Sequence, residues 1–277
     1  MSGHADEKNW TKWFEDFAAE HPQQWEMSDE QAFSGFMMQP SRDDGRSAGR
    51  VDVENQRRAI HSVLDAAKAS ERALQQEITD LLALKNPTPK DEEDYPFYCM
   101  LSVYQSAAVS MATAGMRAGL LEAILKTFLR NLGKDHGNAL RQVKTDYSRW
   151  SDFQKDKDAF NPSKKSKKEN NKSTYDVAFD LLENIGLEIQ KEDRDLFGLL
   201  YNYRNKMLHI GMEWPAEEID KFRKELNKYT NDYFSTATHG EEIWIFYVGD
   251  PFLAALDEAT TRLCRAMGAF VNQLWRS

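Results

Sequence analysis

The 277-residue sequence predicts an all-α protein with a small β-hairpin or strand insertion and an N-terminal helical arm. Three observations predict this class. Long segments carry apolar residues at the 3.6-residue spacing of amphipathic helices. Hydrophobic residues make up 41% of the chain, which is enough to form a core between the polar segments. Residues 243–248 alone have the β-branched and aromatic composition of a convincing strand.

The first 50 residues contain two aromatic clusters and then a polar stretch. The clusters are Trp10, Trp13, Phe14 and Phe17, at helical spacing, followed by Trp25, Phe33 and Phe36. We interpret the first as a short helix that docks on the core or on a partner, in preference to a surface that stacks on bases. Residues 40–49 are rich in Gly, Ser and charges and predict a loop.

Residues 51–84 predict a long amphipathic helix among many charges. Its apolar positions are Ile60, Val63, Leu64, Ala67, Leu74, Ile78, Leu81 and Leu82. Pro87 and Pro89 end it, and we expect the acidic run 90–96 to be a solvated joint, because Pro interrupts helices and like charges repel. The chain therefore divides into an N-terminal arm (1–90) and a helical domain (91–277).

Residues 97–132 are apolar with few charges, and they predict a core helix buried around much of its circumference. The length would suit a membrane span, but scattered polar residues and the central Arg117 favour a soluble core. Small residues from Ser106 to Ala118 permit close packing within the subunit or against a second copy. Arg117 and Glu122 are better explained as ion-paired or solvent-facing charges than as part of a site.

The remaining elements alternate with Gly and Pro. Helices are expected within 133–150 and over 175–185, 192–210, 216–234 and 251–275. The second of these is capped by Ser173 or Thr174 and breaks near Gly186. The helix over 192–210 presents one apolar face and ends at Gly211; that face is Leu196, Leu199, Leu200, Tyr203, Met207 and Ile210. The strand pairs with residues 235–238 across His239–Gly240.

Charge is distributed unevenly along the chain. The formal net charge of -9 argues against a surface that binds nucleic acid everywhere. Residues 137–172, however, contain ten Lys or Arg and five Asp or Glu. The lysine-rich loop within them is interpreted first as solvated surface and second as a contact to RNA phosphates through Lys164, Lys165, Lys167 and Lys168.

Several classes of protein are disfavoured. The N-terminus, with His4, Asp6 and Glu7, lacks the basic and apolar pattern of a secretory signal, so we expect a cytoplasmic protein without a membrane partner. Cys99 and Cys264 are far apart, and neither they nor the histidines have metal-ligand spacing. Nucleotide, dinucleotide, zinc-protease and esterase motifs are missing, so we expect no cofactor.

One segment places three polar groups together on a predicted helix. Asn205 and His209 are i, i+4 neighbours facing away from the core, with Arg204 on the flank. Metal-free cleavage of RNA requires a base for the 2'-hydroxyl, a cation for the phosphorane and an acid for the 5'-oxygen. Histidine exchanges protons near neutrality, arginine holds phosphate with its planar fork, and asparagine can orient either group.

The segment Arg204-Asn205-Lys206-Met207-Leu208-His209 resembles the RNxxxH motif of the HEPN superfamily, and the likeness extends over roughly residues 95–275. The resemblance implies a helical bundle that dimerises so that Arg and His of two copies form one metal-independent endoribonuclease site, often in toxin, antiphage or RNA-processing systems. Some relatives carry a modified Tyr just after the motif His, where Ile210 and Gly211 stand here. Other relatives are inactive.

The sequence therefore predicts an endoribonuclease, acting as a homodimer, that leaves 2',3'-cyclic phosphate ends. Arg204, Asn205 and His209 are the expected catalytic residues, and Lys206 joins the loop lysines as an expected RNA contact. An inhibitor or sensor protein is a further expected partner. Two alternatives stay open: a non-catalytic HEPN module that binds RNA or a protein, and a helical adaptor that binds a partner through its N-terminal aromatic residues.

Overall fold

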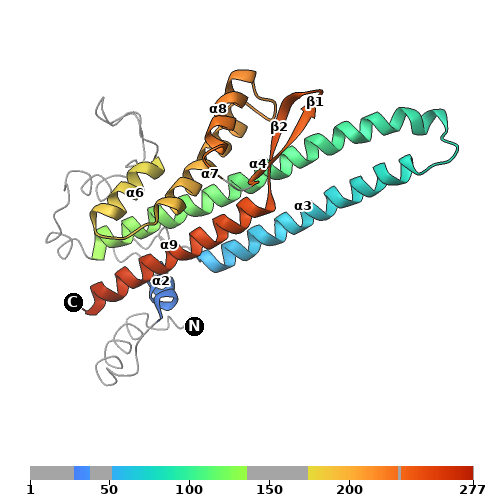
Figure 1. The fold of residues 1–277 in the computed structure, drawn as a ribbon. Coiled ribbons are helices and arrows are strands. Elements are labelled where there is room, and N and C mark those ends of the chain that lie inside the picture. The colour runs from blue at the N-terminus through green and yellow to red at the C-terminus, as the bar shows by residue number, and fades with distance from the viewer. Residues whose placement is uncertain (1–27, 38–51, 136–173, 230–231, 277) are drawn as a thin grey trace, which may run out of the picture.

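The computed structural model describes residues 28–37, 52–135, 174–229 and 232–276. Its elements are α2 (Asp29–Met37), α3 (Val53–Leu82), α4 (Pro89–Asp135), α6 (Thr174–Asn184), α7 (Lys191–His209), α8 (Ala216–Leu226), β1 (Phe234–His239), β2 (Glu242–Val248) and α9 (Asp250–Arg276). The long α4 is the axis of the molecule (Figure 1), with α3 antiparallel along it and α9 beside its other half. The prediction of a mostly helical chain is confirmed.

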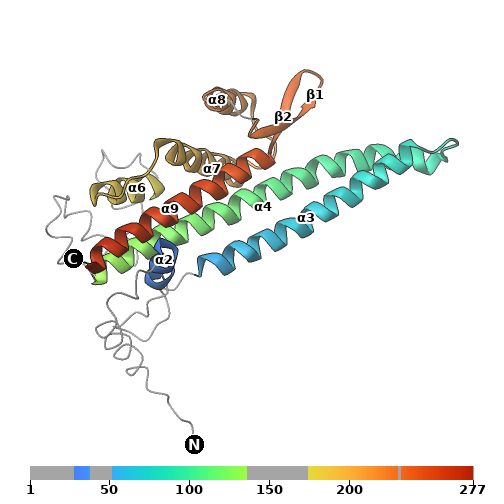
Figure 2. The ribbon, with the colours of Figure 1, turned by 60° about the horizontal axis from the view of Figure 1, so that its bottom comes forward.

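The β-hairpin also agrees with the sequence. β1 pairs antiparallel with β2, and the turn between them contains Gly240 at a φ of 63°, which favours glycine. Figures 1 and 2 show the hairpin beside α8, and β2 also packs on α4, where the Val248 N–H donates to the Ser110 hydroxyl at 3.0 Å. Tyr203 of α7 donates a hydrogen bond to the carbonyl of Phe246 in β2 at 2.8 Å, so the hairpin is tied to the helix that carries the motif.

The expected joint at residues 90–96 is wrong, because α4 already begins at Pro89 and continues through Pro96. The backbone and side chain of Thr88 donate to the carboxylate of Asp91, and the Asp91 N–H donates back to Thr88, so the two residues form a capping box. Asp91 and Glu92 lie in the first turn, where the helix dipole favours acidic groups. The acidic run thus starts a helix.

The two halves of α4 differ in burial. From Ala114 to Leu132 the helix contributes much of the core, as expected. Near its start, Phe97, Met100 and Leu101 are 64%, 45% and 42% exposed. Helix α3 runs beside this end of α4 (Figure 2), and the two helices extend together beyond the rest of the described fold. The prediction of all-round burial therefore holds for the second half alone.

By length and composition, residues 89–129 could also cross a membrane. The core helix of a soluble protein can have the same length and composition, so these two properties do not identify a membrane span.

The expected apolar face of α3 is only partly buried. Leu64, Leu74 and Ile78 are buried, whereas Val63 and Leu82 are more than half exposed.

Helix α2 was not expected from the sequence, although it buries Phe33 and Phe36. Ser28 and Gln31 exchange hydrogen bonds in a capping box at its start. The helix packs on α9, where a side chain at Gly268 would collide with the backbone of Asp29. Near the end of α2, Asn131 of α4 donates a hydrogen bond to the carbonyl of Phe36.

Helix α8 is shorter than predicted, ending at Leu226 where residue 234 was expected. Its Ile219 and Phe222 are buried, and Phe222 lies within about 5 Å, centroid to centroid, of three other rings: Trp214, Phe234 and Phe246. This cluster requires the aromatic residues after α8 to lie in an extended strand. The packing therefore overrides the helical propensity of that segment. The expected helix within 133–150 lies outside the described residues beyond Asp135, as do the first aromatic cluster and the loop over 40–49.

Candidate active site

The motif occupies the last turns of α7. This helix forms because one apolar face, including Leu196, Leu199, Leu200, Tyr203 and Met207, is buried against α4 and α9, as predicted. Gly211 follows with a φ of 102°, a conformation that ends helices and favours glycine. The indole Nε1 of Trp214 donates to the Gly211 carbonyl at 2.9 Å and fixes the chain after the turn.

Ile210 does not lie on the buried face as expected, since it is 39% exposed. The helix ends at His209, and Ile210 is its C-terminal cap, with its N–H donating to the carbonyl of Lys206. Helical periodicity no longer fixes the direction of a side chain at that point. Leu208 is 52% exposed, so apolar surface flanks His209 on both sides in sequence.

Arg204 and Asn205 contact each other directly. The Arg204 Nη1 donates to the Asn205 Oδ1 at 2.9 Å. The Arg204 Nε is buried and has no hydrogen-bond partner within the described residues. Asn205 therefore holds the guanidinium in place through one of its terminal nitrogens, while the buried Nε faces away from solvent.

His209 is exposed at the end of α7. In the described part of the chain it makes no hydrogen bond to Arg204 or Asn205, although it lies one turn beyond Asn205. Its imidazole is free to meet a ligand or a second subunit. The motif thus consists of a fixed arginine–asparagine pair and an unconstrained histidine.

Lys206 has a structural role in this arrangement. Its ammonium pairs with the carboxylate of Glu218 in α8, lies 5.6 Å from the centre of the Trp214 ring, and leaves the side chain only 12% exposed. The hydrogen bonds from Lys206 and Lys221 lower the pKa of Glu218 to about 2. An RNA contact by Lys206 would require this pair to open. The other expected contacts, Lys164, Lys165, Lys167 and Lys168, lie outside the described residues.

A polar cleft of about 700 Å³ opens next to the motif, between α6, α7 and the end of α8. Asn205 contributes to its wall. The other lining residues are Tyr175, Asp176, Lys191, Arg194, Asp195, Gly198, Tyr201, Asn202, Glu225, Lys228 and Tyr229. Among the described residues, neither Lys191 nor Lys228 has an ion-pair partner. The cleft is large enough for a nucleotide, and its three cations, Lys191, Arg194 and Lys228, are equalled in number by its carboxylates, Asp176, Asp195 and Glu225.

Aromatic packing shapes one wall of the cleft. Tyr175 stacks on Tyr201 with ring centres 4.6 Å apart and planes within 4°. Gly198 permits this, since a Cβ at that position would lie 2.9 Å from the Tyr175 hydroxyl. Burial raises the pKa of Tyr175 and Tyr201, so both phenols stay protonated as hydrogen-bond donors.

Sequence reasoning missed Asn202, whose amide donates to the carboxylate of Glu225 in α8. A signal was present, because Asn202, Asn205 and His209 recur at i, i+3 and i+7 on one helical stripe. Tyr175, Glu225 and Lys228 carried no such signal, since other segments bring them to the cleft.

The other candidates have structural explanations. Arg117 is ion-paired with Asp257 and Glu122 with Lys126, as the sequence indicated. Cys99 and Cys264 are half-buried free thiols, and burial raises the pKa of Cys264 to about 12, so it is a poor nucleophile. No three His, Cys, Asp or Glu side chains of the described residues are grouped so that they could hold a metal ion.

Comparisons of the chain with protein-family models, with curated proteins and with solved structures find no match. The HEPN resemblance therefore rests on the motif and its helical context, and membership of that superfamily stays a prediction.

Proposed function

We propose that this chain is a metal-independent endoribonuclease of HEPN type that acts as a homodimer in the cytoplasm. The observation that supports this most directly is the position of Asn205, which both fixes the Arg204 guanidinium and lines a nucleotide-sized cleft. His209, one turn further, is exposed at the end of the same helix. Cation, orienting group and proton carrier thus lie within six consecutive residues.

In the proposed reaction the 2'-oxygen of a ribose attacks the adjacent phosphorus while a histidine accepts the 2'-hydroxyl proton. Arg204 stabilises the negative charge that develops on the non-bridging oxygens. The bond from phosphorus to the 5'-oxygen breaks, and that oxygen receives a proton. One product ends in a 2',3'-cyclic phosphate and the other in a 5'-hydroxyl, and no metal or other cofactor takes part.

A second copy of the chain suits this chemistry. Proton removal and proton donation occur on opposite sides of the phosphorus, and a dimer would supply one His209 for each role. The exposed Leu208 and Ile210 give the motif an apolar border suited to burial between subunits. On α4 the partly exposed Gly115 and the exposed Gly119 lie on the helix that α7 packs against, and their lack of side chains would permit close approach.

A non-catalytic module that binds RNA or a protein is the second candidate. The observation that favours it is the absence, within the described residues, of any hydrogen bond that orients His209. An imidazole used for catalysis is commonly held by a second group. In a binding module, Arg204 and the cleft lysines would contact phosphates without cleavage.

The test is incubation of the full chain and its His209→Ala variant with end-labelled RNAs in EDTA. Since a positioned acid or base contributes about 10²–10⁴-fold, the variant should lose cleavage by that factor. The chain itself should leave cyclic phosphate ends. His239→Ala is the matched control. His239 is exposed at the end of β1 and is not part of the motif, so this variant should cleave RNA normally.

Light scattering on the same samples reports the oligomeric state. A folded dimer that binds RNA in a gel-shift assay but cuts none would support the binding module. Cleavage that depends on added Mg²⁺, or that survives in the His209→Ala variant, would contradict the proposed mechanism.

A further inference from the structure

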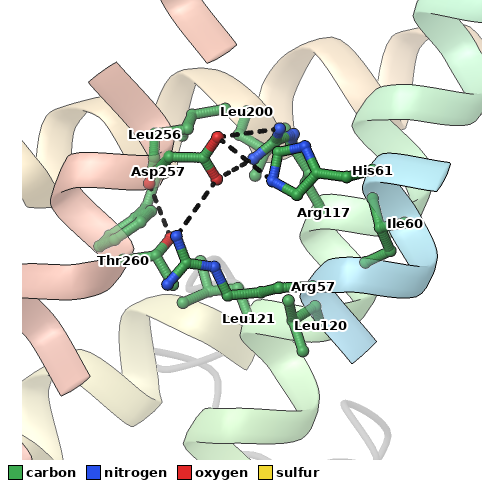
Figure 3. Close-up of a pocket in the computed structure, with 11 residues that line it drawn as sticks. Arg57, Ile60, His61, Arg117, Leu120, Leu121, Leu200, Leu256, Asp257 and Thr260 are labelled. Carbon is green, nitrogen blue, oxygen red and sulfur yellow. Dashed lines mark hydrogen bonds and ion pairs between the residues drawn. The ribbon is translucent and has the colours of Figure 1, made fainter. Parts of the chain in front are cut away.

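A second group of arginine and histidine side chains surrounds Asp257, at the meeting point of α3, α4 and α9. Figure 3 shows Arg57 and His61 from α3 and Arg117 from α4 directed toward this carboxylate. Arg117 binds it with both terminal nitrogens, one of them at 3.1 Å. The nearest nitrogens of Arg57 and His61 lie at 3.9 and 3.8 Å, beyond hydrogen-bond distance.

The positive charge in this cluster exceeds the negative charge. Two arginines face one carboxylate, and His61 adds a further charge whenever it is protonated. Of the acidic residues near these cations in sequence, Glu54 pairs with Arg58 and Glu258 with Arg262, while Asp65, four residues after His61, is exposed. Among the described residues, Asp257 is the carboxylate that lies within 4 Å of the cluster, and an excess of positive charge at a partly buried position is electrostatically costly without an anion.

Donors are available to such an anion. Arg57 makes one long hydrogen bond, from Nη1 to the Thr261 hydroxyl at 3.3 Å, and its side chain is 25% exposed. The imidazole of His61 is 49% exposed. The Nε of Arg117 is buried with no hydrogen-bond partner in the described part of the chain. Arg57 and His61 are i, i+4 neighbours, so both reach the same point from one helix face.

The space between these groups is narrow. The cavity measures about 20 Å³, and its inner wall is apolar, with Leu120, Leu121, Phe197, Leu200 and Leu256. A volume of that size admits about one water-sized group. One oxygen of a tetrahedral oxyanion can enter, while the rest stays at the mouth beside Arg57 and His61. A nucleoside would not fit inside.

We propose that Arg57, His61 and Arg117 form a binding site for a phosphate group, either free phosphate or the end of a phosphomonoester. Asp257 orients Arg117 and keeps the anion on the side of Arg57 and His61. The site shares no lining residue with the cleft beside Asn205, and it does not depend on the proposed ribonuclease activity. A bound phosphate would join α3 to the core, since α3 supplies two of the three cations.

The first measurement is isothermal titration of the full chain with sodium sulfate against a chloride background of equal ionic strength. Sulfate is a suitable probe because it stays a dianion between pH 6 and pH 8. The Arg57→Gln variant should bind it at least about tenfold more weakly, since a charge-assisted hydrogen bond is lost. Arg72→Gln is the control: Arg72 is an exposed arginine on the same helix, about three turns beyond His61, and its loss should leave binding unchanged.

Two further variants give changes of defined sign. Asp257→Asn removes the competing carboxylate and should tighten sulfate binding, provided that circular dichroism shows a folded chain. His61→Gln removes one of the three side chains directed toward the site and should weaken sulfate binding.

Inorganic phosphate and a nucleoside 5'-monophosphate, compared in the same assay, identify the source of the phosphate group. Equal affinities that fall together in Arg57→Gln assign the site to the phosphate alone. Tighter binding of the nucleotide that is also lost in Arg57→Gln assigns it to a larger phosphomonoester, and nucleotide binding that survives in Arg57→Gln belongs to the cleft beside Asn205 and contradicts the proposal for this ligand. Equal sulfate binding by the chain and its Arg57→Gln variant would overturn it. So would stabilisation by sulfate without a saturable heat, which is the general effect of an excluded salt.

Discussion

Two groupings of arginine and histidine occur in this protein, and they are built in opposite ways. Arg204 and His209 come from the last two turns of α7, where Asn205 holds the arginine and the histidine is unconstrained. Arg57, His61 and Arg117 come from two helices and converge on Asp257 of a third. The first can be read from six consecutive residues; the second exists only because α3, α4 and α9 pack together.

The difference concerns where charge is balanced. Around Asp257, Arg117 is only 11% exposed and depends on its carboxylate partner, so that grouping contributes to stability. At the end of α7 the cation is held by a neutral amide and the histidine is exposed, so little stability depends on either. Changes at the motif should therefore affect activity, and changes at Asp257 should affect stability.

The largest expected effect is on cleavage by Arg204→Gln. Because the variant removes the cation that stabilises the phosphorane, the rate should fall by about 10²–10³-fold with a melting temperature close to that of the unmodified chain. Single-turnover kinetics on a labelled RNA, together with a melting curve, checks both parts. Arg58→Gln, on α3, serves as the control and should leave the rate unchanged.

A fall in melting temperature of more than a few degrees in Arg204→Gln, without loss of cleavage, would reverse the assignment and make Arg204 a structural residue.

Asp257→Ala should have the next largest effect, on stability. It leaves the mostly buried Arg117 without its partner, which should lower the free energy of unfolding by about 2 kcal/mol after allowance for solvent at the half-buried carboxylate. Urea denaturation followed by circular dichroism measures this. Glu258→Ala is the control, since Glu258 is 74% exposed, and its effect should stay within about 0.5 kcal/mol.

If the two variants were equally stable, Asp257 would not be the group that balances the buried arginine, and the comparison between the two groupings would fail.

The smallest expected effect concerns Lys206, next to the motif. Because Lys206 and Lys221 lower the pKa of Glu218 from 4.5 to about 2, this carboxylate contributes stability above pH 4.5 that is lost as the pH falls toward 2. Lys206→Met removes the largest cause of the lowered Glu218 pKa, so this variant should lose less stability than the unmodified chain as the pH falls. Melting temperatures between pH 5 and pH 2 test this, with Lys224→Met as an exposed control.

An identical pH profile for Lys206→Met and the unmodified chain would show that the pair is not formed in solution, and would return Lys206 to the expected RNA contacts.

Local patterns predicted most elements well. The face of α7 from Leu196 to Met207, the break at Gly211 and the hairpin across Gly240 were all evident, because each depends on residues close in sequence. The start of α4 differs from the prediction because the prolines and like charges of residues 87–96 suggest a joint, whereas a capping box of Thr88 and Asp91 starts the helix. The end of α8 was misjudged because an aromatic cluster with Phe234 decides it.

By itself the sequence determined most of the helices, the hairpin and the three residues of the motif, since helical spacing and turn chemistry act over a few residues. Only the tertiary structure decided that Lys206 is paired with Glu218, that Asn205 faces a cleft, and that Arg57 and His61 meet Arg117. The physical reason is that charge balance and burial depend on which helices lie side by side. In this protein those partners are up to about two hundred residues apart along the chain.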